Sequence, residues 1–175
     1  MDQSVIPECY VDTNLIETLV PPNRQYNHQK GCGTVTKVMK EKFADRFALG
    51  IIDKDKVTVD YLKEFDSLIQ FESLILHKHK IKPHYIIQIY PAIERFILES
   101  AQQVGVNLAD FDLPVEINLL KKASKTLNSK SDQRFQRLFR QIRQKGSPQF
   151  EKLASWISYL KSYPYTINLD DLKKL

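Results

Sequence analysis

Two carboxylates follow a short apolar segment of the chain. Residues 47–52 read Phe-Ala-Leu-Gly-Ile-Ile, and Asp53 and Asp55 come directly after them. Such a run predicts a buried strand, and side chains two residues apart on a strand point the same way. Two like charges in one place repel each other unless a cation lies between them, and hard oxygen ligands suit Mg²⁺ or Mn²⁺. The pair is therefore a candidate metal site, with a solvated Asp-Lys-Asp turn as the alternative.

Two further acids occupy similar positions. Asp12 closes the predicted first strand, and Glu94 follows a later strand by a short turn. Functional groups of open α/β sheets collect at the carboxyl ends of the parallel strands, so we expect these acids to meet Asp53 and Asp55 in one crevice. A metal held by such a cluster supports phosphoryl transfer, because it neutralises phosphate oxygens and orients an attacking water. Asp12 and Glu94 are candidates both for metal ligands and for the general base.

The elements that must position these acids follow a regular rhythm. Strands are predicted at 5–11, 24–29 and 47–52, and helices are predicted to begin at Asn14 and near Thr34. This βαβαβ alternation predicts a mostly parallel, mixed sheet flanked by helices, with right-handed crossovers. Farther along, residues 74–76 and 84–90 are predicted strands that can pair as a hairpin, and residues 92–98 begin another helix.

The last third of the chain has a different character. After Pro114 the pattern is helical throughout, and two apolar stripes have the spacing of buried helix faces. They consist of Phe135, Leu138, Phe139 and Ile142, and of Phe150, Leu153, Trp156, Ile157 and Leu160. We expect an α/β core over residues 1–113 and a helical extension over residues 114–175, packed together as one structural domain.

The extension is also the basic part of the chain. Residues 121–145 contain nine basic residues and one acid, Asp132, in a protein whose formal net charge is +5. A local excess of this kind favours a polyanionic partner, although a solvated helix face is the alternative. Lys30, beside a Gly-Cys-Gly turn that precedes a helix, is a further phosphate-binding candidate. The candidate nucleic-acid contacts are Lys30, Lys121, Lys122, Arg137, Arg140, Arg143 and Lys145.

Composition excludes several classes of protein. The 175 residues are 42% hydrophobic and 27% charged, which is typical of a globular domain rather than a fibrous or low-complexity chain. No apolar run approaches the ~20 residues needed to cross a bilayer, and no signal peptide is evident, so we expect a cytoplasmic protein without a membrane partner. The two cysteines, Cys9 and Cys32, are expected to be reduced thiols.

The order strand-acid-helix, strand-Gly-helix, strand-Asp-x-Asp resembles the Toprim domain of topoisomerases, primases and OLD-type nucleases. The resemblance covers residues 5 to about 100, with Asp53-Lys54-Asp55 as its best match, and the segment 91–97 is similar to the RloB-like branch of Toprim-related proteins. Toprim proteins carry Glu-Gly after the first strand, where this chain has Asp12-Thr13, which implies an altered metal site. The resemblance implies Mg²⁺- or Mn²⁺-dependent cleavage of nucleic acid, and its RloB-like part implies bacterial defence against phage.

A second resemblance is to the PIN-domain ribonucleases. It rests on residues 10–16, Tyr-Val-Asp-Thr-Asn-Leu-Ile, which are similar to the Asp-Thr-Asn opening of that family. An Asp-x-Asp element at the third strand is not its usual form, so it ranks second. Both families would use Asp12 and a divalent ion on a phosphodiester.

These observations leave two functional hypotheses. The first is a metal-dependent nuclease or related phosphoryl-transfer protein, with Asp12, Asp53, Asp55 and Glu94 as metal ligands. The second is a non-catalytic subunit that keeps the Toprim-like fold and binds nucleic acid or a protein partner in a larger complex. The substitution of Asp12-Thr13 for the expected Glu-Gly favours the second.

Overall fold

A mixed five-stranded sheet organises the protein. The computed structural model describes residues 2–54 and 59–175, and within them the strand order is β1-β2-β5-β4-β3. The strands are β1 (Val5–Pro7), β2 (Ala48–Asp53), β3 (Phe65–Phe71), β4 (Leu74–His79) and β5 (His84–Ile89). β1, β2 and β5 are parallel, whereas β4 and β3 are antiparallel to their neighbours. The predicted α/β class and the β4–β5 hairpin are confirmed; β3 was not predicted.

Seven α-helices surround this sheet in the described residues. They are α1 (Tyr10–Leu19), α2 (Cys32–Val38), α3 (Ile93–Gln103), α4 (Ile117–Ser124), α5 (Gln133–Gln144), α6 (Pro148–Ser162) and α7 (Leu169–Lys174). Shorter helical turns are η1 (Asp2–Ser4), the π-helical η2 (Met39–Phe43), η3 (Asp60–Glu64), η4 (Leu108–Phe111) and η5 (Leu127–Lys130). None of the helices described is long and apolar enough to cross a membrane.

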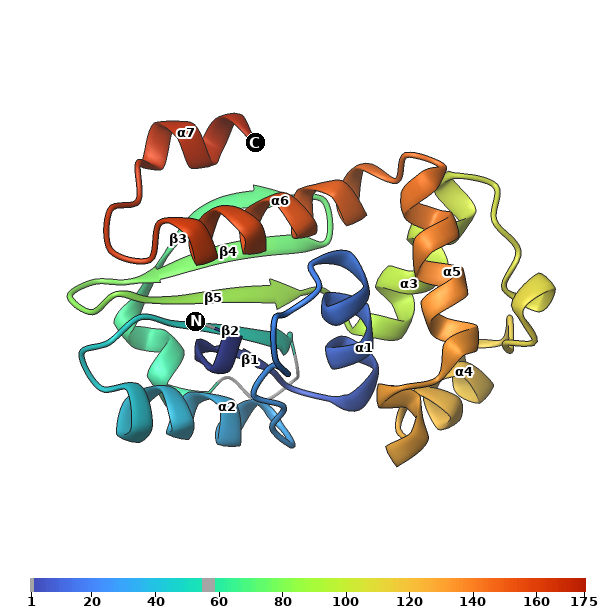
Figure 1. Cartoon of the computed structure of the whole chain (residues 1–175), viewed down its shortest axis with the longest axis horizontal. Helices are drawn as coiled ribbons and strands as arrows, with labels where there is room; N and C mark the ends of the chain where they lie inside the picture. The colour runs from blue at the N-terminus through green and yellow to red at the C-terminus, as the bar shows by residue number, and fades with distance from the viewer. Residues whose placement is uncertain (1, 55–58) are drawn as a thin grey trace.

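Alternating side chains bury both faces of the sheet, as the two-residue period of a strand requires. Leu49 and Ile51 of β2 belong to the larger apolar cluster, with α1, α3, α5 and α6. Ala48 and Ile52 belong to the smaller cluster, with α2 and η2. Figure 1 shows α2 and α6 on opposite sides of the strands. Asp53 continues the odd-numbered series, which places it on the face that carries α1 and α3.

The start of the chain differs from the prediction. The first strand ends at Pro7 rather than at residue 11, and α1 begins at Tyr10 rather than at Asn14. Proline cannot donate a ladder hydrogen bond, and Val11, four residues before Leu15, already belongs to the buried helix face. Asp12 therefore lies in the first turn of α1, and the prediction that it closes the first strand is wrong.

The predicted strand at 24–29 is not formed as a strand, but part of it lies along the sheet edge. The amides of Asn27 and Gln29 donate to the carbonyls of Val5 and Pro7, at 3.0 Å each. These bonds advance in the same direction on both segments, so residues 27–29 run parallel to β1. The segment thus satisfies the open edge of β1 without a regular ladder.

The helical extension shares the core of the sheet. All the residues of the two predicted apolar stripes are buried. They lie in the same cluster as side chains of β2 and β5. In Figure 1 the strands β2 and β5 point toward the helices α3, α4 and α5. The extension therefore closes the end of the sheet at which the candidate acids lie.

Candidate active site

A glutamate that the sequence reasoning missed follows the first strand directly. Glu8 comes after Pro7, and it is 8% exposed. Its Oε2 accepts a hydrogen bond of 2.9 Å from the amide of Asp53, and its own amide donates to the carbonyl of Ile51 at 3.0 Å. The glutamate therefore lies against the carboxyl end of β2. Pro7 is the sequence feature that could have revealed this glutamate, because the proline ends β1 directly before Glu8.

Asp12 contributes to this region from the first turn of α1. Its Oδ2 accepts a hydrogen bond of 3.1 Å from the amide of Cys9, the residue that caps the helix. A carboxylate at this position satisfies one of the unpaired amides at a helix start. Its other oxygen, Oδ1, is buried and has no hydrogen-bond partner among the described residues. An acceptor oriented in this way, at 1% exposure of the residue, is costly unless something binds it.

Asp53 is the last residue of β2, one residue beyond the end of the predicted strand 47–52, and connects the sheet to α3. Its Oδ1 accepts a hydrogen bond of 2.9 Å from the amide of Ile93, the first residue of that helix. Asp55, the other half of the predicted pair, lies outside the described residues. The geometry of the Asp-x-Asp element is thus described only for its first member.

Glu94 lies in the first turn of α3 and is 5% exposed. Its Oε1 accepts a hydrogen bond of 2.6 Å from the hydroxyl of Ser124, at the end of α4. The helical extension therefore contributes directly to the position of this carboxylate. Glu94 follows the strand by a short turn, as predicted.

These four carboxylates, Glu8, Asp12, Asp53 and Glu94, form what we call the acid cluster. Burial raises the pKa of Asp53 well above its usual range, and the negative charges of Asp12, Glu8 and Glu94 raise it further. Burial and the charges of Glu8 and Glu94 likewise raise the pKa of Asp12, against the hydrogen bonds from Cys9 that lower it. Within the part of the chain that the structure describes, no cation is among the principal electrostatic influences on either group. The cluster therefore resists full ionisation.

The donor chemistry of the cluster suits a hard divalent cation. The oxygen atoms, their low exposure and the unsatisfied Oδ1 of Asp12 all favour Mg²⁺ or Mn²⁺ over softer metals. Nevertheless, the described residues contain no group of three or more His, Cys, Asp or Glu side chains placed to hold an ion as they stand. Glu8, Asp12, Asp53 and Glu94 lie near one another, but their side chains do not form a ready coordination sphere.

The predicted nucleic-acid contacts divide into several groups. Lys121 and Lys122 are exposed on α4, whose end carries the serine bonded to Glu94. On α5, Arg140 is exposed, and Lys145 is exposed just beyond the helix end. Lys30 is exposed beside α2.

Two of the predicted contacts on α5 also take part in internal interactions. The guanidinium of Arg143 donates to the carbonyl of Leu19 at 2.6 Å and to Glu151 at 3.1 Å. Arg137 lies 3.9 Å from a carboxylate oxygen of Asp112. Arg143 thus joins α5 to α1 and α6, whatever else it contacts.

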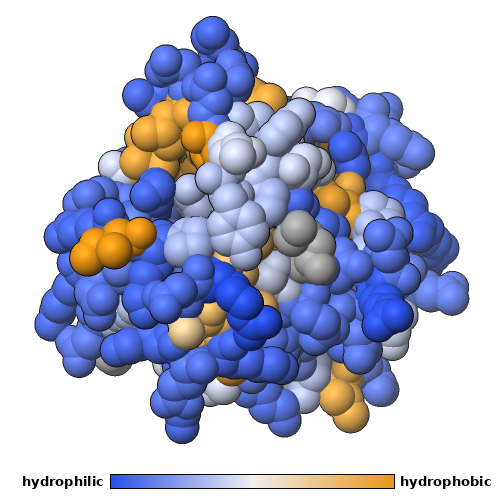
Figure 2. Space-filling model, turned by 60° about the vertical axis from the view of Figure 1, so that its left-hand side comes forward, coloured by the Kyte–Doolittle hydropathy of each residue, from blue (hydrophilic) through white to orange (hydrophobic). Residues whose placement is uncertain are grey.

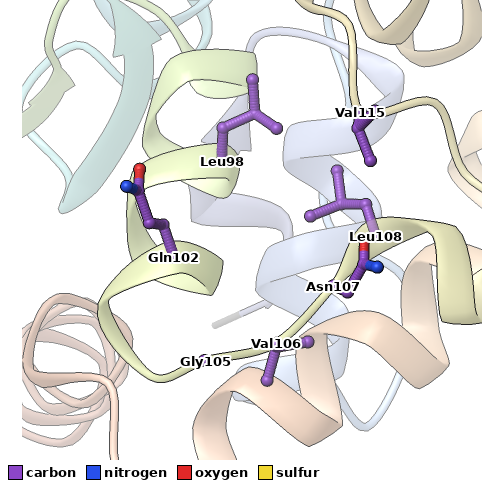
Figure 3. A pocket seen from close by; sticks show the side chains of 7 residues that line it. All are labelled: Leu98, Gln102, Gly105, Val106, Asn107, Leu108 and Val115. Atoms are coloured by element: carbon purple, nitrogen blue, oxygen red, sulfur yellow. The ribbon is translucent and has the colours of Figure 1, made fainter.

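A pocket elsewhere in the molecule lacks comparable chemistry. It has a volume of about 370 Å³ and lies between α3 and the segment that follows it (Figure 3). Leu98, Leu108 and Val115 supply much of its lining, and its polar side chains are the amides of Gln102 and Asn107. No acid, base or nucleophile is among the residues that line it.

The surface seen in Figure 2 is mostly hydrophilic, and its hydrophobic side chains lie in small separate groups. The acid cluster therefore remains the candidate active site.

Comparison of the chain with models of protein families, with curated proteins and with solved structures found no match.

Proposed function

We propose that the protein is a metal-dependent nuclease or a related phosphoryl-transfer protein that acts on nucleic acid. The observation that carries this proposal is the acid cluster, four carboxylates gathered where β1 and β2 end and α3 begins, where no cation of the described residues is among the principal electrostatic influences on Asp12 and Asp53. Natural proteins rarely bury uncompensated charge except at functional sites. A bound Mg²⁺ or Mn²⁺ would supply charge neutralisation of a phosphate.

Within this proposal the chain's own residues have distinct tasks. Asp12 and Asp53 would hold the metal, because one oxygen of each is fixed by a backbone amide. Asp55 is a further ligand by its place in the sequence. Glu94, oriented by Ser124, would serve as a ligand or as the base that takes a proton from the attacking water.

Glu8 supports the Toprim-like interpretation in particular. The resemblance implies a glutamate directly after the first strand. The sequence prediction placed Asp12 at that position, because it extended the first strand to residue 11. Glu8 occupies that position directly, next to Asp53. The expected glutamate is therefore present in the chain, followed by Cys9 rather than by glycine. We accordingly propose Glu8 as a catalytic or metal-binding residue. From the RloB-like part of the resemblance we also propose a cytoplasmic role in defence against phage.

The test is cleavage of supercoiled DNA, single-stranded DNA and RNA by the purified protein with Mn²⁺ or Mg²⁺. We expect cleavage by the wild type and a loss of at least about a hundredfold in Asp53→Asn and Glu8→Gln, because removing charge from a phosphoryl-transfer site removes metal binding. Asp66→Asn, an exposed position on β3, is the matched control and should cleave like the wild type. Equal activity in Asp53→Asn and the wild type would contradict the proposal.

A non-catalytic role is the second candidate, and specific hydrogen bonds favour it. Asp12 accepts a hydrogen bond from the amide of Cys9 at the start of α1, and Glu94 joins α3 to α4 through Ser124. Carboxylates used in this way can be structural, with a shared proton in place of a metal. In that case Mn²⁺ leaves the thermal midpoint unchanged, whereas an ion that binds only the folded state raises it by mass action.

A further inference from the structure

A pocket of mixed character lies beside the acid cluster, at the carboxyl ends of β2 and β5. Its volume is about 500 Å³, within the range of small-molecule sites. Three cationic side chains line it, Lys54 after β2, Arg95 on α3 and Lys121 on α4, and none of its lining residues within the described ranges 2–54 and 59–175 is acidic. The remaining lining residues are Tyr90, Pro91, Ala92 and Ile117. We call it the basic pocket.

Residues of the basic pocket are direct sequence neighbours of residues of the acid cluster. Lys54 directly follows Asp53, and Arg95 directly follows Glu94. The amide of Ile93, next to the pocket residue Ala92, donates to Asp53. The end of β2 and the start of α3 thus carry residues of both the acid cluster and the basic pocket.

Tyr90 gives the pocket an aromatic surface. It is 51% exposed and directly follows the buried strand β5. The ammonium of Lys54 lies over its ring, 4.8 Å from the ring centroid. A cation is thereby placed beside an exposed aromatic ring, a combination that suits the phosphate and the base of one nucleotide.

We propose that the basic pocket binds one nucleotide of a single-stranded nucleic acid, with its phosphate at Lys54, Arg95 and Lys121 and its base against Tyr90. This inference rests on the proposed function and names the form of its substrate. Stacking requires an unpaired base with an accessible face, so a duplex cannot use the ring in this way. The arrangement would hold the strand with a neighbouring phosphodiester directed toward the acid cluster.

Binding is measured by fluorescence anisotropy of labelled dT12 and U12 in EDTA, which prevents cleavage. We expect the wild type to bind at least one of these strands about tenfold or more tightly than the matching duplex. Lys121→Glu should weaken single-strand binding about tenfold and make it less sensitive to salt. The slope of the logarithm of the binding constant against the logarithm of the salt concentration changes by about 0.7 for each single-strand phosphate that a protein neutralises. Lys173→Glu, the same charge change on exposed α7, is the control and should change affinity less than twofold.

The aromatic part of the inference has its own pair of variants. Tyr90→Ala should weaken binding several-fold to about tenfold, because base stacking on an aromatic side chain contributes substantially to single-strand affinity. Tyr90→Phe, which keeps the ring, should bind like the wild type. Circular dichroism of each variant verifies that it is folded before its affinity is compared.

Three results would overturn the inference: no single-strand binding by the wild type, equal affinity for duplex, or equal effects of Lys121→Glu and Lys173→Glu. The outcome is separable from that of the cleavage test. Binding that depends on the pocket without metal-dependent cleavage would refute the nuclease proposal alone. If Tyr90→Ala and Lys121→Glu both cleave nucleic acid and bind single strands as tightly as the wild type, the proposed role of the basic pocket is refuted and the nuclease proposal stands.

Discussion

At the scale of single residues, the protein concentrates negative charge where it is least favourable. Asp12 is buried and Asp53 is half-buried, and each experiences the field of Glu8 and Glu94. An arrangement of this kind costs stability when its members are ionised, and proteins tolerate such costs mainly where function requires them. The hydrogen bonds from Cys9 and Ile93 fix the geometry without neutralising the charge.

The first prediction at this scale concerns pH. Folding raises the pKa of Asp53 to about 9, so at this carboxyl the folded state binds more protons than the unfolded chain between about pH 4 and pH 9, and its contribution to the stability of the metal-free protein falls as the pH rises through that range. Asp53→Asn keeps an oxygen for the Ile93 amide but removes the charge. We expect it to raise the free energy of unfolding, by at most about 1.4 kcal/mol for each pH unit above the usual pKa of an aspartate.

The measurement is urea denaturation at pH 5 and pH 8 in EDTA. The gain in Asp53→Asn should be larger at pH 8 than at pH 5, because the free energy lost by keeping the folded carboxyl protonated grows with the pH above the usual pKa of an aspartate. Asp66→Asn on β3 should change stability by less than about 0.5 kcal/mol at both values. If Asp53→Asn is less stable than the wild type at pH 8, favourable interactions in the folded protein offset the charge of Asp53, and the prediction is wrong.

At the scale of elements, the position of β2 depends on a close approach by α2. Gly50 lies on the face of β2 that carries α2, and a Cβ at this position would lie 2.9 Å from Sδ of Met39 and 3.1 Å from Cγ1 of Val35. The glycine therefore allows the helix and the strand to approach closely. Since β2 ends in Asp53, this contact also positions the candidate site.

We expect Gly50→Val to lower the free energy of unfolding by about 1–3 kcal/mol, because the added side chain overpacks the helix–strand contact. Gly33 on α2 is the matched control, because a Cβ there meets nothing within 4 Å. Gly33→Val should alter stability by less than about 1 kcal/mol. Thermal or urea denaturation distinguishes the two variants, and equal effects would contradict the proposed close packing.

At the scale of the whole molecule, the helical extension and the α/β core are joined by polar contacts as well as by the shared apolar cluster. The side-chain amide of Asn14 on α1 donates to the carbonyls of Ser129 and Asp132, at 2.7 and 3.1 Å. Ser124 bonds Glu94, and Arg143 bonds the carbonyl of Leu19. These contacts bring the basic helices to the side of the acid cluster.

We therefore expect the chain to unfold in a single transition. Trp156, the one tryptophan of the sequence, is buried on α6 and reports on the extension, while far-UV circular dichroism reports on the whole chain. Phe139→Ala should lower the free energy of unfolding by about 3–5 kcal/mol and shift both signals together. Leu127→Ala, at a position that is 69% exposed, should change it by less than about 0.5 kcal/mol. Separate transitions would indicate that the extension is an independent domain.

The sequence by itself determined the α/β class, β2 with Asp53 at its end, and the buried stripes of α5 and α6. These features follow from local periodicity, which a strand or helix expresses regardless of its neighbours. It misplaced the end of the first strand, because the apolar residues among 5–11 permit a strand until helix packing from Val11 onward is known. Glu8 was missed for the same reason.

Only the tertiary structure decided which charged groups meet. Parallel pairing of β1 with β2 brings Glu8 to Asp53, and packing of α4 on α3 brings Ser124 to Glu94. The same packing places Lys121 with Lys54, Arg95 and the exposed Tyr90 in the basic pocket. Residues separated by tens of positions have no common local pattern, so their encounter depends on the pairing and packing of whole elements.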